Sequence, residues 1–243
     1  MDKPVLIVDG KLRRIRQLSE SIVGEVAFVV GAQEQDVAVL NKFLDAKYLY
    51  FYELRAKDLA PLGLIGGLRH LKIHWNTKLT SLETISDLRQ LRTLILQETP
   101  KILRLDPLTC LPNLEAFEYL GGMWNNNVAQ TLEPLAELPK LEELTLRRLR
   151  VKTGGLRPLG KCKALRSLFL SNTFQTADYA YLSVVLRDTE CDLFTPWIRV
   201  DGPNGLDTMI TGKRKLLNST LDTEQICSYE EEFRRLQDDF RRT

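Results

Sequence analysis

The chain has 243 residues, of which 44% are apolar and 27% are charged, and its formal net charge is +2. This composition is typical of a soluble globular protein, and the small net charge points to no particular partner. The apolar run that precedes Asp9 is too short for a signal segment, and no run approaches the length of a membrane span. We therefore expect a cytoplasmic protein without a membrane partner.

Residues 1–24 are expected to form an N-terminal cap. The run VLIVD at 5–9 predicts a strand, and the segment up to about residue 24 predicts a turn with a short helical piece. Such a cap would cover the first of the repeated units that follow, because the end of a repeat array otherwise exposes its apolar core.

Five copies of one motif follow each other along the chain. L-x-P-L occurs four times, and LETI is the same motif without the proline; the copies lie at 59–62, 82–85, 105–108, 132–135 and 156–159. Nine residues after each copy begins an apolar pair with one residue between its members: Leu71 and Ile73, Leu94 and Leu96, Phe117 and Tyr119, Leu144 and Leu146, and Leu168 and Leu170. Extending the frame outward predicts three more pairs: Val26 and Phe28, Leu49 and Phe51, and Cys191 and Leu193.

The repeat predicts a solenoid over residues 25–197. Apolar positions three apart, ended by a step of two, fit a short helical turn that is followed by a bend and a short strand. One coil cannot cover its own apolar face, so about eight coils stack, and their strands pair in parallel into one curved sheet. Cys110 and Cys162 lie on or beside this frame, and we expect both to be buried reduced thiols.

Residues 198–243 are expected to form a C-terminal cap. The cluster DGPNG at 201–205 predicts a turn, TMITG a short strand and GKRK a polar turn, which together make a hairpin. Steps of three and four between apolar residues then predict an amphipathic helix over 223–241. Its apolar residues are Ile226, Tyr229, Phe233, Leu236 and Phe240. We expect this helix to pack as a lid on the last coils.

The frame L-x-x-L-x-x-L-x-x-L-x-L over about residues 26–195 resembles the internalin-like class of bacterial leucine-rich repeat proteins. The tail, TGKRKLLN followed by an amphipathic helix, is similar to the tails of uncharacterised cytosolic bacterial proteins with such repeats. The resemblance implies an α/β solenoid, a leucine-rich repeat horseshoe with a concave parallel sheet, and it implies no activity. That class has a column of asparagines in the turn after the strand. Here the turns carry Asn76, Glu98 and Ser171-Asn172, so we expect a different turn geometry.

No motif predicts catalysis, a cofactor or a metal site. GLRPLGKC at 155–162 nearly matches a P-loop, but it contains frame leucines and no apolar strand leads into it. His70 and His74 flank a strand pair and have no obvious third ligand, so we expect them to be surface residues. Neither a nucleophile–histidine arrangement nor a paired-carboxylate site stands out. We expect a protein that is not an enzyme.

Residues that alternate with the buried strand pairs should face the open side of the sheet. Aromatic, histidine and arginine side chains gather there, and aromatic residues and arginine dominate the hot spots of protein interfaces. We predict a partner-binding surface made of Tyr48, Tyr50, Tyr52, His70, Lys72, His74, Ile95, Glu118, Glu143, Arg147 and Phe169. The alternative is that the three tyrosines pack under the N-terminal cap.

The coil between Phe117 and Leu144 is longer than its neighbours, because it contains the segment LGGMWNNNVAQT at 120–131. A longer loop that carries Met123 and Trp124 can reach a partner, so Trp124 joins the predicted surface. The alternative is that Trp124 folds back onto the edge of the solenoid.

Charge separates strongly in one part of the chain. From Arg147 to Ala177 there are eight basic residues and no acidic one. A nucleic-acid groove would need a basic stripe with interleaved aromatic residues. We therefore favour contact with an acidic protein surface, or pairing with the glutamates of the preceding coil.

These features together predict a non-catalytic protein–protein interaction module, such as an immunity or antitoxin-like inhibitor or an adaptor. The alternative function is nucleic-acid or acidic-surface binding through the basic coil 147–166, joined by Lys213 to Lys215.

Overall fold

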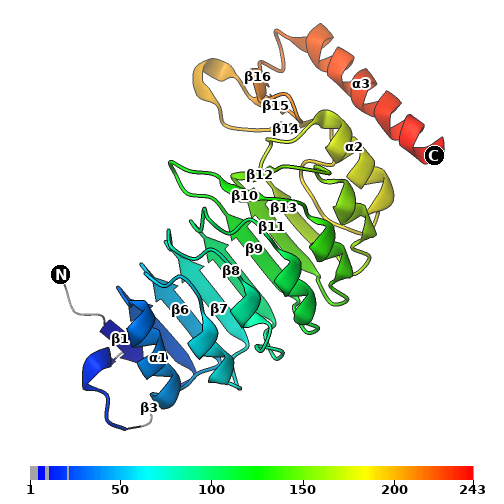
Figure 1. Cartoon of the computed structure of the whole chain (residues 1–243). Coiled ribbons are helices and arrows are strands. Elements are labelled where there is room, and N and C mark those ends of the chain that lie inside the picture. The colour runs from blue at the N-terminus through cyan, green and yellow to red at the C-terminus, as the bar shows by residue number, and fades with distance from the viewer. Residues whose placement is uncertain (1–4, 9–10, 21, 243) are drawn as a thin grey trace.

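The computed structural model describes residues 5–8, 11–20 and 22–242 (Figure 1). Residues 1–4, 9–10, 21 and 243 lie outside the description, and so do the parts of the predicted cap that fall on them, Asp9 included. The described chain is a row of coils stacked along one direction, with the earliest coils at one end and the C-terminal segment at the other.

Within the described residues, nine strands form one sheet in the order β13-β11-β9-β8-β7-β6-β4-β1-β2, in which β1 (Val5–Val8) and β2 (Lys11–Arg14) lie at one edge. Seven neighbouring strands of this sheet run parallel: β4 (Val26–Val30), β6 (Tyr48–Tyr52), β7 (His70–His74), β8 (Thr93–Gln97), β9 (Ala116–Leu120), β11 (Glu143–Arg147) and β13 (Ser167–Leu170). From β6 to β13 the predicted pairs are in register from coil to coil, with Leu94 opposite both Leu71 and Phe117. The predicted parallel sheet is confirmed.

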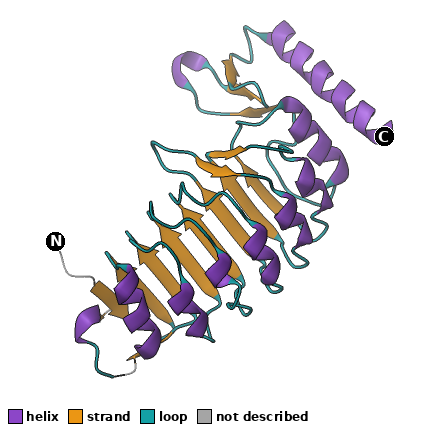
Figure 2. Ribbon diagram, in the orientation of Figure 1, coloured by secondary structure: helices purple, strands orange, loops and turns teal. Residues whose placement is uncertain are grey.

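Short helices cover one face of this sheet (Figure 2). They are α1 (Glu34–Phe43), the 3₁₀ helices η2 (Ala60–Leu64), η3 (Glu83–Ile85), η4 (Asp106–Cys110), η5 (Glu133–Glu137) and η6 (Arg157–Lys161), and α2 (Thr176–Val185). Pro107, Pro134 and Pro158 stand in the first positions of their helices, where a missing N–H costs no hydrogen bond. The L-x-P-L motif therefore marks where each of these 3₁₀ turns begins.

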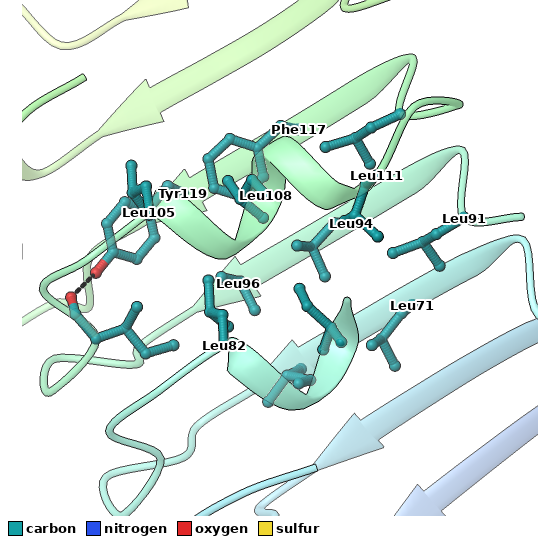
Figure 3. Close-up of a cluster of buried hydrophobic side chains, with 14 of the residues drawn as sticks. Leu71, Leu82, Leu91, Leu94, Leu96, Leu105, Leu108, Leu111, Phe117 and Tyr119 are labelled. Atoms are coloured by element: carbon teal, nitrogen blue, oxygen red, sulfur yellow. Dashed lines mark hydrogen bonds between the residues drawn. The ribbon is translucent and has the colours of Figure 1, made fainter. Parts of the chain in front are cut away.

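The frame leucines lie between the sheet and the helices and form a continuous apolar core (Figure 3). Leu82, Leu94 and Leu144 are all 0% exposed. Truncating such a leucine to alanine is expected to cost about 2–5 kcal/mol of stability, because the stacked coils can collapse only partly into the space. The Tyr119 hydroxyl, also in the core, donates a hydrogen bond to the Ile102 carbonyl, drawn as the dashed line.

The turn after the strand has a left-handed residue in four coils. Glu53, Trp75, Glu98 and Arg148 have φ angles of 57°, 62°, 54° and 49°. The turn keeps this feature although its residues form no asparagine column. Asn76, which follows Trp75, is 0% exposed and hydrogen-bonds the backbone of its own turn and of the coil before it.

The predicted frame is wrong in the first coil. The buried residues of β4 are Ala27 and Val29, whereas Val26 is 54% exposed. The predicted pair of Val26 and Phe28 therefore lies on the opposite face. The extrapolation placed the second residue of the buried pair nine residues before Val37, where the helix motif begins. The residue that is actually buried, Val29, lies only eight residues before Val37. A shift by one residue turns every side chain of a strand to the other face.

The frame also ends earlier than predicted at the other side. Cys191 and Leu193 form no strand in the structure; the ladder beyond β13 is reduced to one isolated parallel bridge between Ser167 and Glu190. The chain turns there towards the C-terminal cap.

At the N-terminal end, β1 (Val5–Val8) continues the sheet antiparallel to β4, and β2 (Lys11–Arg14) pairs with β1 at the sheet's edge. The 3₁₀ helix η1 (Ile15–Gln17) follows, with Ile15 buried in the core. β3 (Ile22–Val23) pairs in parallel with β5 (Leu44–Asp45). Strands β1 and β2 thus extend the long sheet sideways, whereas β3 and β5 form a separate two-stranded sheet.

At the C-terminal end, a small antiparallel sheet precedes a long helix: β14 (Trp197–Arg199), η7 (Pro203–Gly205), β15 (Thr208–Ile210), β16 (Lys215–Leu217) and α3 (Thr223–Arg242). Helix α3 packs on α2, where the rings of Tyr181 and Phe240 meet edge to face at 5.5 Å and Phe233 is buried. The Gln237 amide donates a 2.8 Å hydrogen bond to the Ser183 hydroxyl. No helix of the described chain is both long and apolar enough to cross a membrane.

Candidate functional site

The face of the sheet that the helices leave uncovered, called the open face below, carries the side chains that the sequence placed there. In β6, Leu49 and Phe51 point into the core. The alternate residues point away from it: Tyr48, Tyr50 and Tyr52. Tyr48 is 43% exposed. Because β1 and β2 lie beside β4 in the plane of the sheet, the described strands of the N-terminal cap do not cover the tyrosines, contrary to the alternative.

The register of β6 and β7 brings the tyrosines and histidines together. Tyr48 lies opposite His70, and their rings stack with centroids 4.1 Å apart and planes 3° apart. The Nδ1 atom of His70 is 3.0 Å from the Thr93 hydroxyl of the next strand. The Lys72 ammonium lies 4.9 Å from the centre of the Tyr50 ring, within the range of a cation–π interaction.

A second chain of contacts crosses three coils. The Tyr50 hydroxyl is 3.1 Å from Nδ1 of His74, and Nε2 of His74 is 3.4 Å from a carboxylate oxygen of Glu98. With the imidazole proton on Nε2, tyrosine donates to histidine and histidine donates to glutamate. These contacts restrict the rotamers, so the open face is organised before any partner arrives.

Beside the stacked rings the open face has an apolar hollow of about 190 Å³. Five of the predicted residues line it, namely Tyr48, Tyr50, His70, Lys72 and Ile95. Val26 lines it as well, and sequence reasoning missed this residue because the frame placed it in the core. The signal that could have found it is its position opposite Tyr48 in the parallel register of β4 and β6.

Burial sets the protonation of two groups on this face. It raises the pKa of Tyr50, with a smaller contribution from Tyr52. It lowers the pKa of His70 from 6.5, and the nearby positive charge of Arg92 acts in the same direction. At neutral pH both groups are therefore uncharged.

The remaining predicted residues lie on the open face but outside the hollow. Tyr52 and His74 end their strands and meet edge to face at 5.1 Å. Further along the sheet, the residues on β9, β11 and β13 are Glu118, Glu143, Arg147 and Phe169. Phe169 is 57% exposed, although a large apolar side chain is usually covered. The open face is thus one surface with its densest aromatic cluster over β6 and β7.

The loop at 120–131 projects from the solenoid. Trp124 is 88% exposed and Met123 is 71% exposed, so Trp124 does not fold back onto the edge. The Arg148 guanidinium donates a 2.9 Å hydrogen bond to the Met123 carbonyl. The extra residues also create a strand pair that the sequence did not predict, in which β10 (Asn127–Ala129) runs parallel to β12 (Leu149–Val151).

The basic residues of coil 147–166 are not neutralised by the preceding coil as a group. Lys161 does pair with Glu133 at 3.2 Å. Arg157 instead lies 3.7 Å from Asp178 of helix α2, and its guanidinium lies over the rings of both Tyr181 and Phe240. Two of the others, Arg148 and Arg150, line a cleft between the solenoid and the C-terminal cap.

The prediction that Cys110 is buried is wrong. Cys110 is exposed, because it ends the 3₁₀ helix η4 and lies outside the apolar frame. Cys162 is buried as predicted, and burial raises its pKa to about 11. In the near-P-loop segment, Leu156 and Leu159 are core residues and Arg157–Lys161 forms a 3₁₀ turn, so it has the structure of an ordinary coil. Among the described residues, no three metal-ligating side chains come together.

The fold and these surfaces define a leucine-rich repeat solenoid. No protein-family model matches the chain, and no curated protein matches its sequence. The chain is similar in structure to internalin C2 from Listeria monocytogenes, with a TM-score of 0.51 and 22% identity over 68% of each chain. This likeness confirms the internalin-like fold that the repeat predicted.

Two further solved structures are more distant. An internalin (inlF) from Listeria monocytogenes has a TM-score of 0.36 at 19% identity, over 63% of this chain and 62% of its own. The leucine-rich repeat domain of APL1B has a TM-score of 0.28 at 14% identity, over 58% of this chain and 59% of its own.

Proposed function

We propose that this protein is a non-catalytic recognition module that binds a protein partner through the open face. The observation that carries the proposal is the solvent-exposed aromatic cluster around the apolar hollow, where Tyr48 stacks on His70 beside the exposed Val26. Tyrosine presents a large and rigid contact area with few torsions to restrict, and this makes it effective in protein interfaces.

The size of the hollow favours a macromolecular partner. Its volume of about 190 Å³ is smaller than the roughly 300–1,000 Å³ typical of small-molecule sites. The open face continues from the hollow over several strands to Phe169 on β13. A protein partner typically covers a broad surface of this kind. One side chain of the partner would enter the hollow, and the rest of the interface would spread along the sheet.

The chemistry of the cluster supports binding over catalysis. A tyrosine that acts as a nucleophile or base needs a lowered pKa, whereas burial raises the pKa of Tyr50. The two ring nitrogens of His74 contact Tyr50 and Glu98. These groups hold each other in place, which suits a preorganised binding surface.

Within this class we propose the role of an immunity or antitoxin-like inhibitor, or of an adaptor, in a bacterial cytoplasm. Support for a reducing compartment comes from the four cysteines, all of which are free thiols. An inhibitor of this kind would protect cells when it is co-expressed with the toxin encoded beside it.

The proposal is tested with the double variant Val26→Ser and Tyr48→Ala, which removes apolar contact area from the hollow. Immobilised wild-type protein and variants are incubated with lysate of the source cells, and retained proteins are quantified by mass spectrometry. Leu221→Ala is the matched control, because Leu221 is 82% exposed but lies in the C-terminal cap. We expect a partner retained by wild type and control and lost by the double variant. Equal recovery by all three proteins would exclude the open face as the binding surface.

A further inference from the structure

A second concavity, called the basic cleft below, lies where the solenoid meets the C-terminal cap. Its volume is about 810 Å³. Its walls are β12, the turn at Gly154 and Gly155, the start of helix α2 and the loop from Gly212 to Arg214. It shares no lining residue with the open face, so an inference about it goes beyond the proposed function.

The lining of the basic cleft is strongly cationic. One carboxylate, Asp178, stands among the lining residues against five cationic side chains: Arg148, Arg150, Arg157, Lys213 and Arg214. In the sequence, the basic residues of coil 147–166 and those of the loop from Gly212 to Arg214 are far apart. The fold brings them to one place.

Three of these arginines form no ion pair with any described residue. Arg148 donates to the Met123 carbonyl at 2.9 Å, and Arg214 donates to the Thr173 carbonyl at 3.2 Å. Both acceptors are uncharged. Arg150 lies exposed on β12, and its side chain makes no hydrogen bond or ion pair with any described residue. Exposed cations gathered in one concave place attract and hold anions, because their potentials add.

Hydrogen bonds fix the two walls of the basic cleft relative to each other. The Asn172 amide donates to the Ile210 carbonyl at 2.8 Å and accepts from the Gly212 N–H at 2.6 Å. The Thr176 hydroxyl donates to the Thr211 carbonyl at 3.0 Å. A Cβ atom on Gly212 would lie 2.3 Å from the Thr176 nitrogen, so the loop can approach helix α2 only with glycine at this position.

The start of helix α2 adds to the positive potential. The N-cap residue Gln175 lines the basic cleft and makes no side-chain capping bond. The N-terminus of a helix carries a partial positive charge, which favours anions near its first turn. Helix α2 is ten residues long, so this contribution supports that of the arginines.

An exposed apolar surface borders the basic cleft. Asn126 of the projecting loop lines the cleft, and Arg148 binds the same loop at Met123. Met123 and Trp124 are therefore attached to the rim and are the most exposed large apolar residues of that loop. A ligand that fits both features carries several negative charges next to a large apolar group.

We propose that the basic cleft binds an acidic segment of a protein partner, with carboxylates on the arginines and an apolar side chain against Trp124. Guanidinium groups bind carboxylates through two parallel hydrogen bonds, and four of the five cations are arginines. Single-stranded nucleic acid would require several aromatic platforms along a basic track, whereas Trp124 is the one strongly exposed aromatic ring on this rim among the described residues. The observations therefore favour a peptide over a nucleic acid.

The test measures fluorescence anisotropy with the full chain. The probe is a fluorescein-labelled peptide in which glutamate alternates with leucine around one tryptophan, and labelled oligothymidine is the comparison. The cleft variant is Arg150→Glu with Arg214→Glu. The matched control is Arg166→Glu with Arg187→Glu, which makes the same charge change at two arginines outside the cleft. Arg187, like Arg214, donates to a backbone carbonyl, here that of Val184.

We expect wild type and control to bind the peptide alike, and the cleft variant to bind it about tenfold more weakly or worse. Trp124→Ala should also weaken binding, and the open-face variant Val26→Ser with Tyr48→Ala should leave it unchanged. An equal loss in the control would show charge attraction without a site. Tighter binding of oligothymidine than of the peptide, or no binding of the peptide by wild type, would overturn the proposal. Circular dichroism melting curves confirm that each variant folds.

Discussion

Asn76 offers a sharp test of how the turns between coils are held. Its side chain is 0% exposed. The amide group donates to the Ala56 carbonyl at 3.1 Å, and its oxygen accepts from the N–H groups of Lys78 at 2.8 Å and Leu79 at 2.9 Å. One side chain therefore joins two coils and closes a turn. We predict that Asn76→Ala is strongly destabilising.

The magnitude follows from the partners left behind. Each net hydrogen bond contributes about 1 kcal/mol, and a buried group left without a partner costs about 1–3 kcal/mol. Leu79 is buried, so its N–H cannot turn to water, whereas the bond to Lys78 is partly accessible. Together these terms predict a loss of about 3 kcal/mol. For a chain of this length that corresponds to a drop in Tm of roughly 6–12 °C.

Urea unfolding, followed by circular dichroism, measures the loss, and Asn113→Ala serves as the control. Asn113 also joins neighbouring coils, through the Arg89 carbonyl and the Lys140 ammonium, but both of its bonds are exposed. We expect the control to cost less than about 1 kcal/mol because water replaces its partners. If Asn76→Ala costs no more than Asn113→Ala, the argument from buried partners is refuted.

Four further outcomes are expected. Thr99→Val should stabilise the protein by about 1 kcal/mol, because the buried Thr99 hydroxyl has no partner among the described residues; a destabilised variant in urea unfolding would contradict this. Tyr119→Phe should cost about 2 kcal/mol in the same assay, since it leaves the Ile102 carbonyl unpaired in the core, and an unchanged midpoint would count against it. Histidine titration by NMR should find the pKa of His70 below 6.5. The unfolded chain then binds this proton more readily, so His70 contributes stability above pH 6.5 that is lost as the pH falls through the native pKa; the variant His70→Gln should lose this part of the pH dependence. Ellman's reagent should label the exposed thiols of Cys110 and Cys227 quickly in the native protein. It should label Cys162 and Cys191 only on unfolding, because burial raises the pKa of both thiols to about 11.

The middle of the solenoid is readable from the sequence because its packing repeats. In each coil the same spacing carries the chain from the L-x-P-L turn to the strand, so an error in one copy would conflict with its neighbours. The first coil lacks this protection. There α1 (Glu34–Phe43) replaces the shorter 3₁₀ turn, and the strand-to-helix connection is one residue shorter than the repeat predicts. One residue is enough to exchange the buried and exposed faces of β4.

The two surfaces are predictable to different degrees. Alternation within a strand is a local property, so it places Tyr48, Tyr50 and His70 on one face from the sequence alone. The basic cleft cannot be assembled in this way, since Arg150 and Arg214 are far apart in the sequence and meet through the hydrogen bonds of Asn172. No local sequence pattern predicts a contact between residues so far apart in the chain. The near-P-loop pattern at 155–162 lies in the same region, but its backbone forms an ordinary coil and builds no phosphate loop.

The outer edge of the long sheet has a consequence for how the protein behaves in concentrated solution. Among the described residues, strand β2 (Lys11–Arg14) ends the sheet, and the backbone groups along its outer edge could accept a strand from another molecule. Leu12 is 60% exposed there, which would favour such addition. The exposed Arg13 and Arg14 oppose it, because two copies meeting at this edge would bring like charges together. Replacing both arginines with threonine is therefore expected to let two molecules pair through this edge.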